Sequence, residues 1–195
     1  MYTCLSCSSE DNHAKYVRNF TEKMKNYIKS NPNYSSLAKW LHWSFVILFA
    51  YGIYKQIDDL SDLEDLSLLK FEIFFAFIFL LFLAFRFVYM TTTQKTSLPE
   101  NTPKAQKFAA KLVHYSMYFC LFIIVLSGLI IGFLYWFGIK DGSFIEFSIF
   151  IHESFFSIIY WLISIHVIAS IYHRFKQDGV WNSMVPFLKE NKTQK

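Results

Sequence analysis

Four of the six histidines lie inside long apolar segments or at their edges, where an ionisable side chain is costly and commonly serves a function. His152 and His166 are fourteen residues apart. On a helix this spacing gives a rise of about 21 Å and a difference in direction of about 40°. One helix would therefore present two imidazoles on one face, near its opposite ends, and His173 continues the same stripe.

The other two of these histidines, His42 and His114, lie near the starts of their own apolar segments, and His42 matches the depth of His166. Two imidazoles at equal depth on facing helices suit a haem iron held inside a bundle. A dinuclear centre would need ligands within a few ångströms, so the fourteen-residue spacing favours two stacked centres. Taken singly, His42 could be an interfacial residue in an aromatic belt, and His152 a helix-end residue in water.

Further polar groups lie toward the same end of the predicted bundle as His42. Arg86 could pair with haem propionates, because a guanidinium matches a carboxylate, or could anchor the helix at the membrane surface. His114, Tyr118 and His173 offer the hydrogen-bonding and proton-exchanging groups that a quinone requires. The alternative for each of these three is a capping or interhelical hydrogen bond.

Four segments without Asp, Glu, Lys or Arg must position these residues, and they comprise 15, 13, 28 and 20 residues (40–54, 73–85, 112–139 and 154–173). A helix needs about 20 mainly apolar residues to cross a membrane. The first two segments are long enough only if flanking residues enter the interface, where long charged side chains can snorkel. Hydrophobic residues make up 54% of the chain and charged residues only 17%. We therefore predict an all-α integral membrane protein, a four-helix bundle.

The distribution of Lys and Arg predicts that both termini face the cytoplasm. The leader, the second loop and the tail hold 16 of the 19 Lys and Arg, so the net charge of +4 reflects topology and does not indicate nucleic-acid binding. We predict a cytoplasmic arm over 1–35, a transmembrane domain over 36–177 and a cytoplasmic tail over 178–195. The second loop, with Thr91 to Thr93, is expected to be a hydrophilic connection. No cleavable signal peptide is visible.

The leader contains Cys4, Cys7 and His13, which could form a zinc or redox site. One Cys pair without a second pair at zinc-finger spacing is a weak signal. Three Cys in 195 residues also exclude a disulfide scaffold. We interpret the leader as a partly helical cytoplasmic arm.

Short motifs follow the four segments in order: Leu41-His42-Trp43, Arg86, His114 with Tyr118, Ser127-Gly128, His152-Glu153, His166, and Tyr172-His173-Arg174. Over roughly residues 36–190, this pattern resembles the bacterial cytochrome b561 family. These are small four-helix membrane cytochromes that carry b-type haem. The wider group includes the cytochrome b subunits of formate dehydrogenases and nickel hydrogenases. The pattern in the fourth segment is the most specific part of the resemblance.

The resemblance implies that His42 and His166 ligate an inner haem and that His152 ligates an outer one. Gly128 and Gly132 lie in the outer half of the third segment, where small residues would make room for a porphyrin. They could equally form a Gly-x-x-x-Gly seam for helix packing.

One position departs from the family pattern, which has a His near the outer end of the second helix, fourteen residues before Arg86. This chain has Glu72 there, with Lys70 close by. Lys70 or Glu72 could ligate the outer iron, although a lysine would first have to lose its proton. Alternatively the outer haem is five-coordinate on His152, or it is absent. We expect one or two haems, with an outer haem that is unusually ligated.

These features predict an inner-membrane b-type cytochrome that carries electrons within or across the bilayer and exchanges them with quinone. The expected surroundings are membrane lipid, quinone and a soluble or periplasmic redox partner, and a homo-oligomer is compatible with the sequence. One alternative is a membrane anchor subunit of a hydrogenase or dehydrogenase complex. Another, from a different class, is a non-redox four-span transporter or assembly factor that retains the bundle.

Overall fold

The computed structural model describes Lys15 and residues 34–55, 60–94, 98–99 and 102–190, and every regular element in these ranges is helical. The elements are α2 (Ser36–Tyr54), the 3-10 helix η1 (Leu60–Glu64), α3 (Leu66–Thr93), α4 (Lys104–Trp136), α5 (Ser143–Lys176) and α6 (Val180–Met184). The helices α2, α3, α4 and α5 are long and apolar enough to cross a membrane. The predicted all-α architecture with four spans is confirmed. Cys4, Cys7 and His13 lie outside the described residues.

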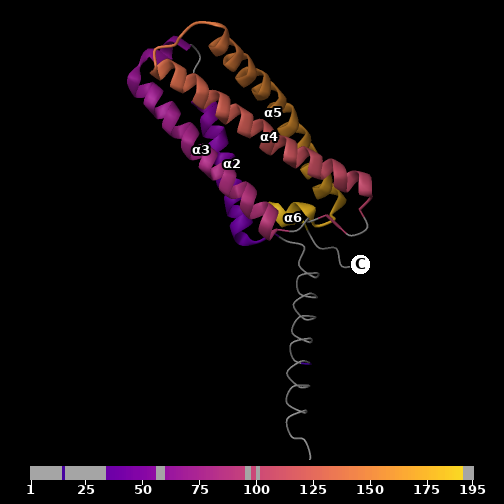
Figure 1. Cartoon of the computed structure of the whole chain (residues 1–195). Coiled ribbons are helices and arrows are strands. Elements are labelled where there is room, and N and C mark those ends of the chain that lie inside the picture. The colour runs from indigo at the N-terminus through magenta and orange to yellow at the C-terminus, as the bar shows by residue number, and fades with distance from the viewer. Residues whose placement is uncertain (1–14, 16–33, 56–59, 95–97, 100–101, 191–195) are drawn as a thin grey trace, which may run out of the picture.

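The four long helices run up and down beside one another, and the short α6 lies across one end of them (Figure 1). We call the end where α2 begins and α5 finishes the terminal end, and the opposite end the loop end. Each long helix packs against the next along the chain, but no described Cα atoms of α2 and α5 approach within 8 Å. The first and last spans are therefore held apart, and only side chains bridge the space between them.

Local chemistry fixes where the helices begin. The Ser35 hydroxyl accepts a hydrogen bond from Ala38 N–H and caps α2. The Asp65 carboxylate does the same for α3 by accepting from Ser67 N–H at 2.8 Å. This bond holds the pKa of the Asp65 carboxyl below its ordinary value, because it favours the charged form. Pro103 and Gly142 precede α4 and α5, whose caps use no side-chain hydrogen bond.

The residues Thr91 to Thr93 continue α3 and do not form a loop, which corrects the sequence-based expectation. Each hydroxyl donates to a backbone carbonyl of the preceding turn, at 2.8 Å from Thr91 to Phe87, and at 2.7 and 2.6 Å in the next two pairs. These bonds satisfy the threonine side chains within the helix. α3 therefore extends beyond the charge-free segment 73–85. α4 and α5 also extend beyond their own charge-free segments.

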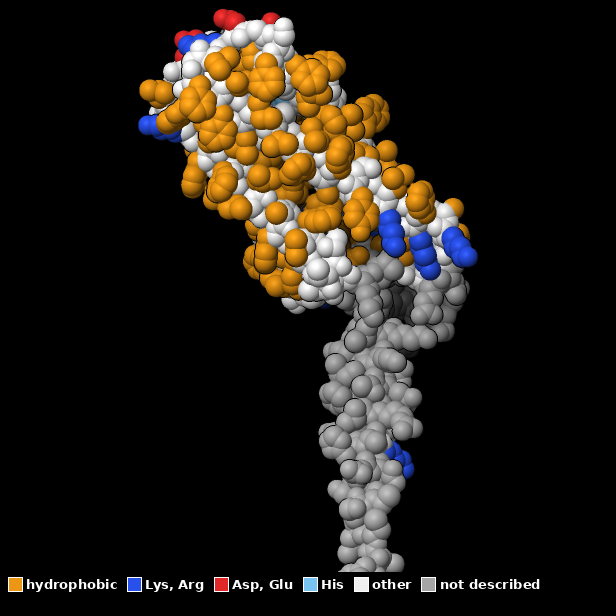
Figure 2. Space-filling model, in the orientation of Figure 1, with side chains coloured by type: hydrophobic (Ala, Val, Ile, Leu, Met, Phe, Trp, Pro, Cys, Tyr) orange, Lys and Arg blue, Asp and Glu red, His pale blue; other side chains and the backbone are white. Residues whose placement is uncertain are grey.

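Hydrophobic side chains cover the flanks of the bundle, while charged side chains gather toward its two ends (Figure 2). Such an exposed apolar surface suits contact with lipid. The inner core is small and lies at mid-depth, where aromatic and aliphatic side chains from all four long helices meet: Phe45, Phe79, Leu83, Cys120, Leu121, Ile124, Val125, Leu129 and Ile159. This core separates two polar regions, one toward each end.

The chain after α5 folds back beneath the terminal end of the bundle. Lys39 Nζ donates to the carbonyl of Asn182 at 3.0 Å, and Trp43 Nε1 donates to that of Met184 at 3.2 Å. The rings of Trp43 and Phe187 are 5.0 Å apart. α6 thus connects α5 to the start of α2, two helices whose described Cα atoms do not approach within 8 Å.

Candidate functional site

The terminal half of the bundle brings three histidines together from three helices. His42 of α2 and His166 of α5 have ring centroids 6.4 Å apart, with an angle of 61° between the ring planes. His114 of α4 lies against His166, with the two ring centroids 4.9 Å apart and the ring planes at 85°. We call these three residues and Arg86 the terminal-end site.

The separation of His42 and His166 fits one metal ion between two imidazoles. With a metal–nitrogen distance of about 2 Å and a ring centre roughly 1 Å behind the nitrogen, two imidazoles on opposite sides of one ion have centroids about 6 Å apart. The 4.9 Å between His114 and His166 is too short for this arrangement and is an edge-to-face contact. Of the two possible partners of His166, the geometry therefore favours His42.

Arg86 of α3 reaches into the same site. Its Nη2 donates to His42 Nδ1, and its guanidinium lies 5.2 Å from the ring centre of Phe45 and 5.5 Å from that of Tyr118. Its Nε is buried without a hydrogen-bond partner, and within the described ranges Arg86 forms no ion pair. A guanidinium with a buried, unpartnered Nε needs an anion for compensation. The carboxylates of a haem would supply one, so these residues fit that group.

The hydrogen bond from Arg86 also fixes the tautomer of His42. A guanidinium only donates, so His42 Nδ1 must accept and the ring proton must reside on Nε2. Ligation of a metal through Nε2 would require that proton to move to Nδ1. Arg86 would then have to turn from His42 toward an anionic group.

The three residues predicted for quinone binding do not share a contact. His114 Nδ1 donates to the carbonyl of Ala110 at 2.6 Å, which leaves Nε2 as an acceptor. Tyr118 packs against Phe87 and Arg86. His173 is buried elsewhere, where its Nδ1 lies 2.7 Å from an Asp178 carboxylate oxygen.

A cavity of about 290 Å³ occupies the loop half of the bundle, and side chains of all four long helices line it. Its walls are mostly apolar: Phe49, Gly52, Ile53, Leu60, Leu63, Ile73, Phe75, Ala76, Phe79, Leu121, Ile124, Val125, Gly128, Ile131, Gly132, Ile149 and Phe156. The remaining lining residues are His152, Glu72 and Glu153. An apolar pocket with few polar groups is typical of a ligand site. We call it the loop-end cavity.

His152 is held at the cavity wall by α4. Its Nδ1 lies 3.0 Å from the Ser127 hydroxyl oxygen, whose own proton is directed to backbone carbonyls of the same helix. Ser127 therefore accepts from His152 Nδ1–H, which leaves Nε2 unprotonated and able to bind a metal. Gly128 permits this approach, since a Cβ there would lie 3.1 Å from His152 Cε1.

Ser127 was not predicted as a site residue. The available signal was a hydroxyl in the middle of an apolar segment, directly before Gly128. A serine on a helix that is apolar on most sides commonly bonds only to its own backbone, so its contact with His152 depends on how α4 and α5 are rotated. The sequence does not specify that rotation.

Glu72 and Lys70, which the sequence offers as alternative ligands of an outer haem, lie in different places. Glu72 lines the loop-end cavity, and its Oε1 is buried without a hydrogen-bond partner. Lys70 is exposed and does not line the cavity; its Nζ lies over the Trp136 ring at 5.8 Å from the centroid. Next to Glu72, Ile73 contacts Gly132 so closely that a Cβ there would lie 2.8 Å from it. The two glycines thus line the cavity and also serve close helix packing.

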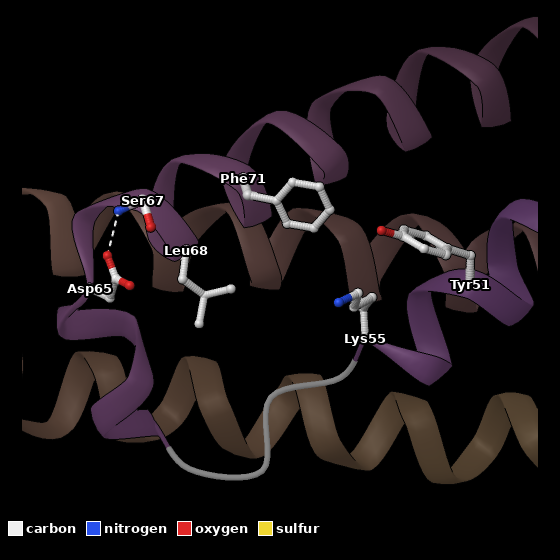
Figure 3. A pocket seen from close by; sticks show the side chains of 6 residues that line it. All are labelled: Tyr51, Lys55, Asp65, Ser67, Leu68 and Phe71. Carbon is white, nitrogen blue, oxygen red and sulfur yellow. Dashed lines mark hydrogen bonds between the residues drawn. The ribbon is translucent and has the colours of Figure 1, made fainter.

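A second hollow, of about 360 Å³, lies between the end of α2 and the start of α3 (Figure 3). Tyr51 and Lys55 face it from α2, and Leu68 and Phe71 from α3, with the Asp65 cap at its rim. No histidine lines this hollow, so it is separate from both sites above.

No group of three or more His, Cys, Asp or Glu side chains in the described part of the chain is arranged to hold a metal ion by itself. Comparison with known proteins gives one family: residues 33–187 match the family model of prokaryotic cytochrome b561. No curated protein and no solved structure was found to match. The matched range includes the four long helices, both sites and α6.

Proposed function

Because this chain belongs to the prokaryotic cytochrome b561 family, we propose that it carries electrons within or across the bacterial inner membrane and exchanges them with quinone. Membership implies a membrane b-type cytochrome that binds haem b and takes part in electron transfer. When bound, haem supplies one-electron chemistry at its iron. The residues of the chain hold it, exclude water and set its charge environment.

The terminal-end site is the part of the molecule that carries this proposal. His42 and His166 would hold the haem iron, because their centroid separation of 6.4 Å suits one iron between them. Arg86 would pair with propionates, since its buried Nε has no partner and no acidic side chain in the described part of the chain forms an ion pair with it. Phe45 lies against Arg86 and belongs to the buried core, so it would exclude water from this site.

His152 would ligate a second haem in the loop-end cavity. Ser127 holds its imidazole in the tautomer that leaves Nε2 free, and the partners on α4 leave it facing an apolar space. Haems toward opposite ends of one bundle would allow electrons to pass between the two membrane surfaces. One or two haems per chain are compatible with these residues.

Quinone exchange is proposed at the terminal end. His114 lies against His166, Tyr118 lies against Arg86, and His173 pairs with Asp178 nearby in sequence. These groups can donate hydrogen bonds and transfer protons as a quinone is reduced or oxidised. The excess of Lys and Arg near both termini supports a cytoplasmic position for this end. A redox partner would then meet the loop end from the periplasm.

Optical and paramagnetic resonance spectra of the purified protein test the proposal. We expect a reducible b-type spectrum with a low-spin component that disappears in His42→Ala and in His166→Ala. The matched control is His114→Ala, which removes an imidazole from the same cluster and should keep the low-spin component. A protein that purifies folded but without haem would support the non-redox alternative. Loss of the low-spin component in His114→Ala alone would exclude the ligand pair.

A further inference from the structure

The loop-end cavity contains one imidazole, whereas the terminal-end site contains three. His152 is the only histidine among its lining residues, and it comes from α5. The other groups able to bind a metal are the carboxylates of Glu72 and Glu153. Whatever iron is bound through His152 therefore has no second imidazole available from the cavity wall.

Glu72 belongs to the part of the wall that is remote from His152. It lies on α3, which makes no direct helix contact with α5, and α4 packs between the two helices. Glu153 is the immediate neighbour of His152 on α5, so its side chain points about 100° away around the helix axis. It is also exposed. Glu72, with its buried and unpartnered oxygen, is thus the polar group across the cavity from His152.

Lys70 does not compete for this position. Its ammonium lies against the Trp136 ring outside the cavity, on an exposed part of α3. Lys70 is therefore not placed to reach an iron bound in the cavity. The group across from His152 is therefore a carboxylate, a hard oxygen ligand that suits Mg²⁺ or Ca²⁺ better than ferrous iron.

Resting on the proposed function, we infer that the loop-end haem has His152 as its only strong axial ligand and binds an exogenous neutral diatomic molecule on the side of Glu72. Iron bound by one histidine can take up such a ligand on its other side, because the space there is mostly apolar and its carboxylate is a poor ligand for ferrous iron. On the α4 side of the cavity, Gly128 lies against the His152 ring and Gly132 against Ile73, so the α4 backbone comes close to both side chains. The terminal-end haem, with two imidazoles, has no position to offer.

Carbon monoxide is the probe for this inference, because it binds ferrous haem only where an axial position is free. The full chain is purified in detergent and reduced, and its haem content and carbon monoxide difference spectrum are measured. We expect two haems per chain, of which about half bind carbon monoxide. In Glu72→His the bound fraction should fall by about tenfold or more, with two haems retained, because an imidazole then occupies the position.

Two matched variants separate ligation from general disturbance. Lys70→Gln changes a residue outside the cavity and should bind carbon monoxide like the unchanged protein, whereas Glu72→Gln keeps the size of Glu72 without adding an imidazole and should retain a haem that binds carbon monoxide. One haem per chain, two haems without carbon monoxide binding, or full binding in Glu72→His would overturn the inference and leave the terminal-end site unaffected. If Glu72→His does not retain haem, His152→Ala decides, and carbon monoxide binding that persists there sinks the idea. A chain with no haem at all would contradict the proposed function itself.

Discussion

The two ends of the bundle hold their histidines in opposite ways. At the terminal end, the rings of His42 and His114 both lie close to His166, and Arg86, whose Nε is buried, donates to His42. At the loop end, His152 stands alone at the edge of a cavity of about 290 Å³. The first arrangement holds three imidazoles and a cation close together, while the second has one imidazole and space. If both bind haem as proposed, a single four-helix framework would hold one iron between two imidazoles and one with a single imidazole.

The difference arises from what each imidazole uses to orient itself. His42 accepts a hydrogen bond from a charged donor, so its orientation depends on a residue that an anion would attract away. His152 donates to the neutral Ser127 hydroxyl, which is itself anchored on the α4 backbone. The loop-end imidazole is thus prepared for a metal in the structure as it stands. The terminal-end pair becomes prepared only when Arg86 moves.

Of the changes proposed here, removing His152 should have the largest effect on haem content, and this effect should be confined to the loop end. In His152→Ala the loop-end cavity loses its only imidazole, so we expect haem content to fall from two to one per chain. The haem that remains should be entirely low-spin. Pyridine haemochrome content and paramagnetic resonance measure both quantities. Retention of two haems would show that another residue holds the loop-end iron.

Ser127→Ala should weaken the loop-end site without removing its ligand. The partner that orients a metal-binding histidine commonly contributes a factor of about 10 to 100 in affinity. We expect a decrease of that size in haem retention at the loop end during dilution or competition with a haem acceptor. The control is Ser148→Ala, because Ser148 is also buried and hydrogen-bonds to the backbone of its own helix rather than to a histidine. Equal losses in the two variants would mean that orientation by Ser127 is unimportant.

The sequence was sufficient for the four spans because charge-free segments and apolar composition are properties of the chain alone. It was insufficient for the helix ends at Thr91 to Thr93, where hydroxyl bonds to the preceding turn satisfy polar side chains inside α3. Those bonds exist only once the helix exists. Composition alone therefore indicates a loop where the structure has a helix.

The sequence predicts how deep in the bundle each site residue lies, but not how each helix is rotated about its own axis. A fixed rise per residue places His42 and His166 at one level, and the structure has them 6.4 Å apart, while their role as ligands stays a prediction. The contacts of Ser127 with His152 and of Arg86 with His42 depend on how each helix turns about its axis. A helix such as α3, apolar on nearly every side, carries no pattern that specifies which side faces inward.

Arg86→Gln should shift the properties of the terminal end alone. A nearby cation favours the reduced state of a haem, so removing it should lower that haem's reduction potential. Unit charges about 10 Å apart at an effective dielectric constant of about 20 interact by about 1.7 kcal/mol, which is about 70 mV for one electron. Partial compensation by propionates reduces the expected shift to roughly 50 mV. A redox titration that follows both haems checks this, and a shift of the loop-end haem instead would contradict the assignment.

Trp43→Phe should have the smallest effect, since it tests only how the tail closes the terminal end. The variant keeps an aromatic ring against Phe187 but loses the hydrogen bond from Nε1 to the Met184 carbonyl. One such bond contributes about 1 kcal/mol, so α6 should detach about five times more often. Limited proteolysis within α6 should accelerate accordingly, while the haem spectra stay unchanged. This variant also tests the terminal-end site, because α6 bridges α2 and α5, which carry His42 and His166 and have no direct helix contact. If proteolysis accelerates and the low-spin spectrum also changes, the spacing of the two histidines depends on the tail as well as on the four spans.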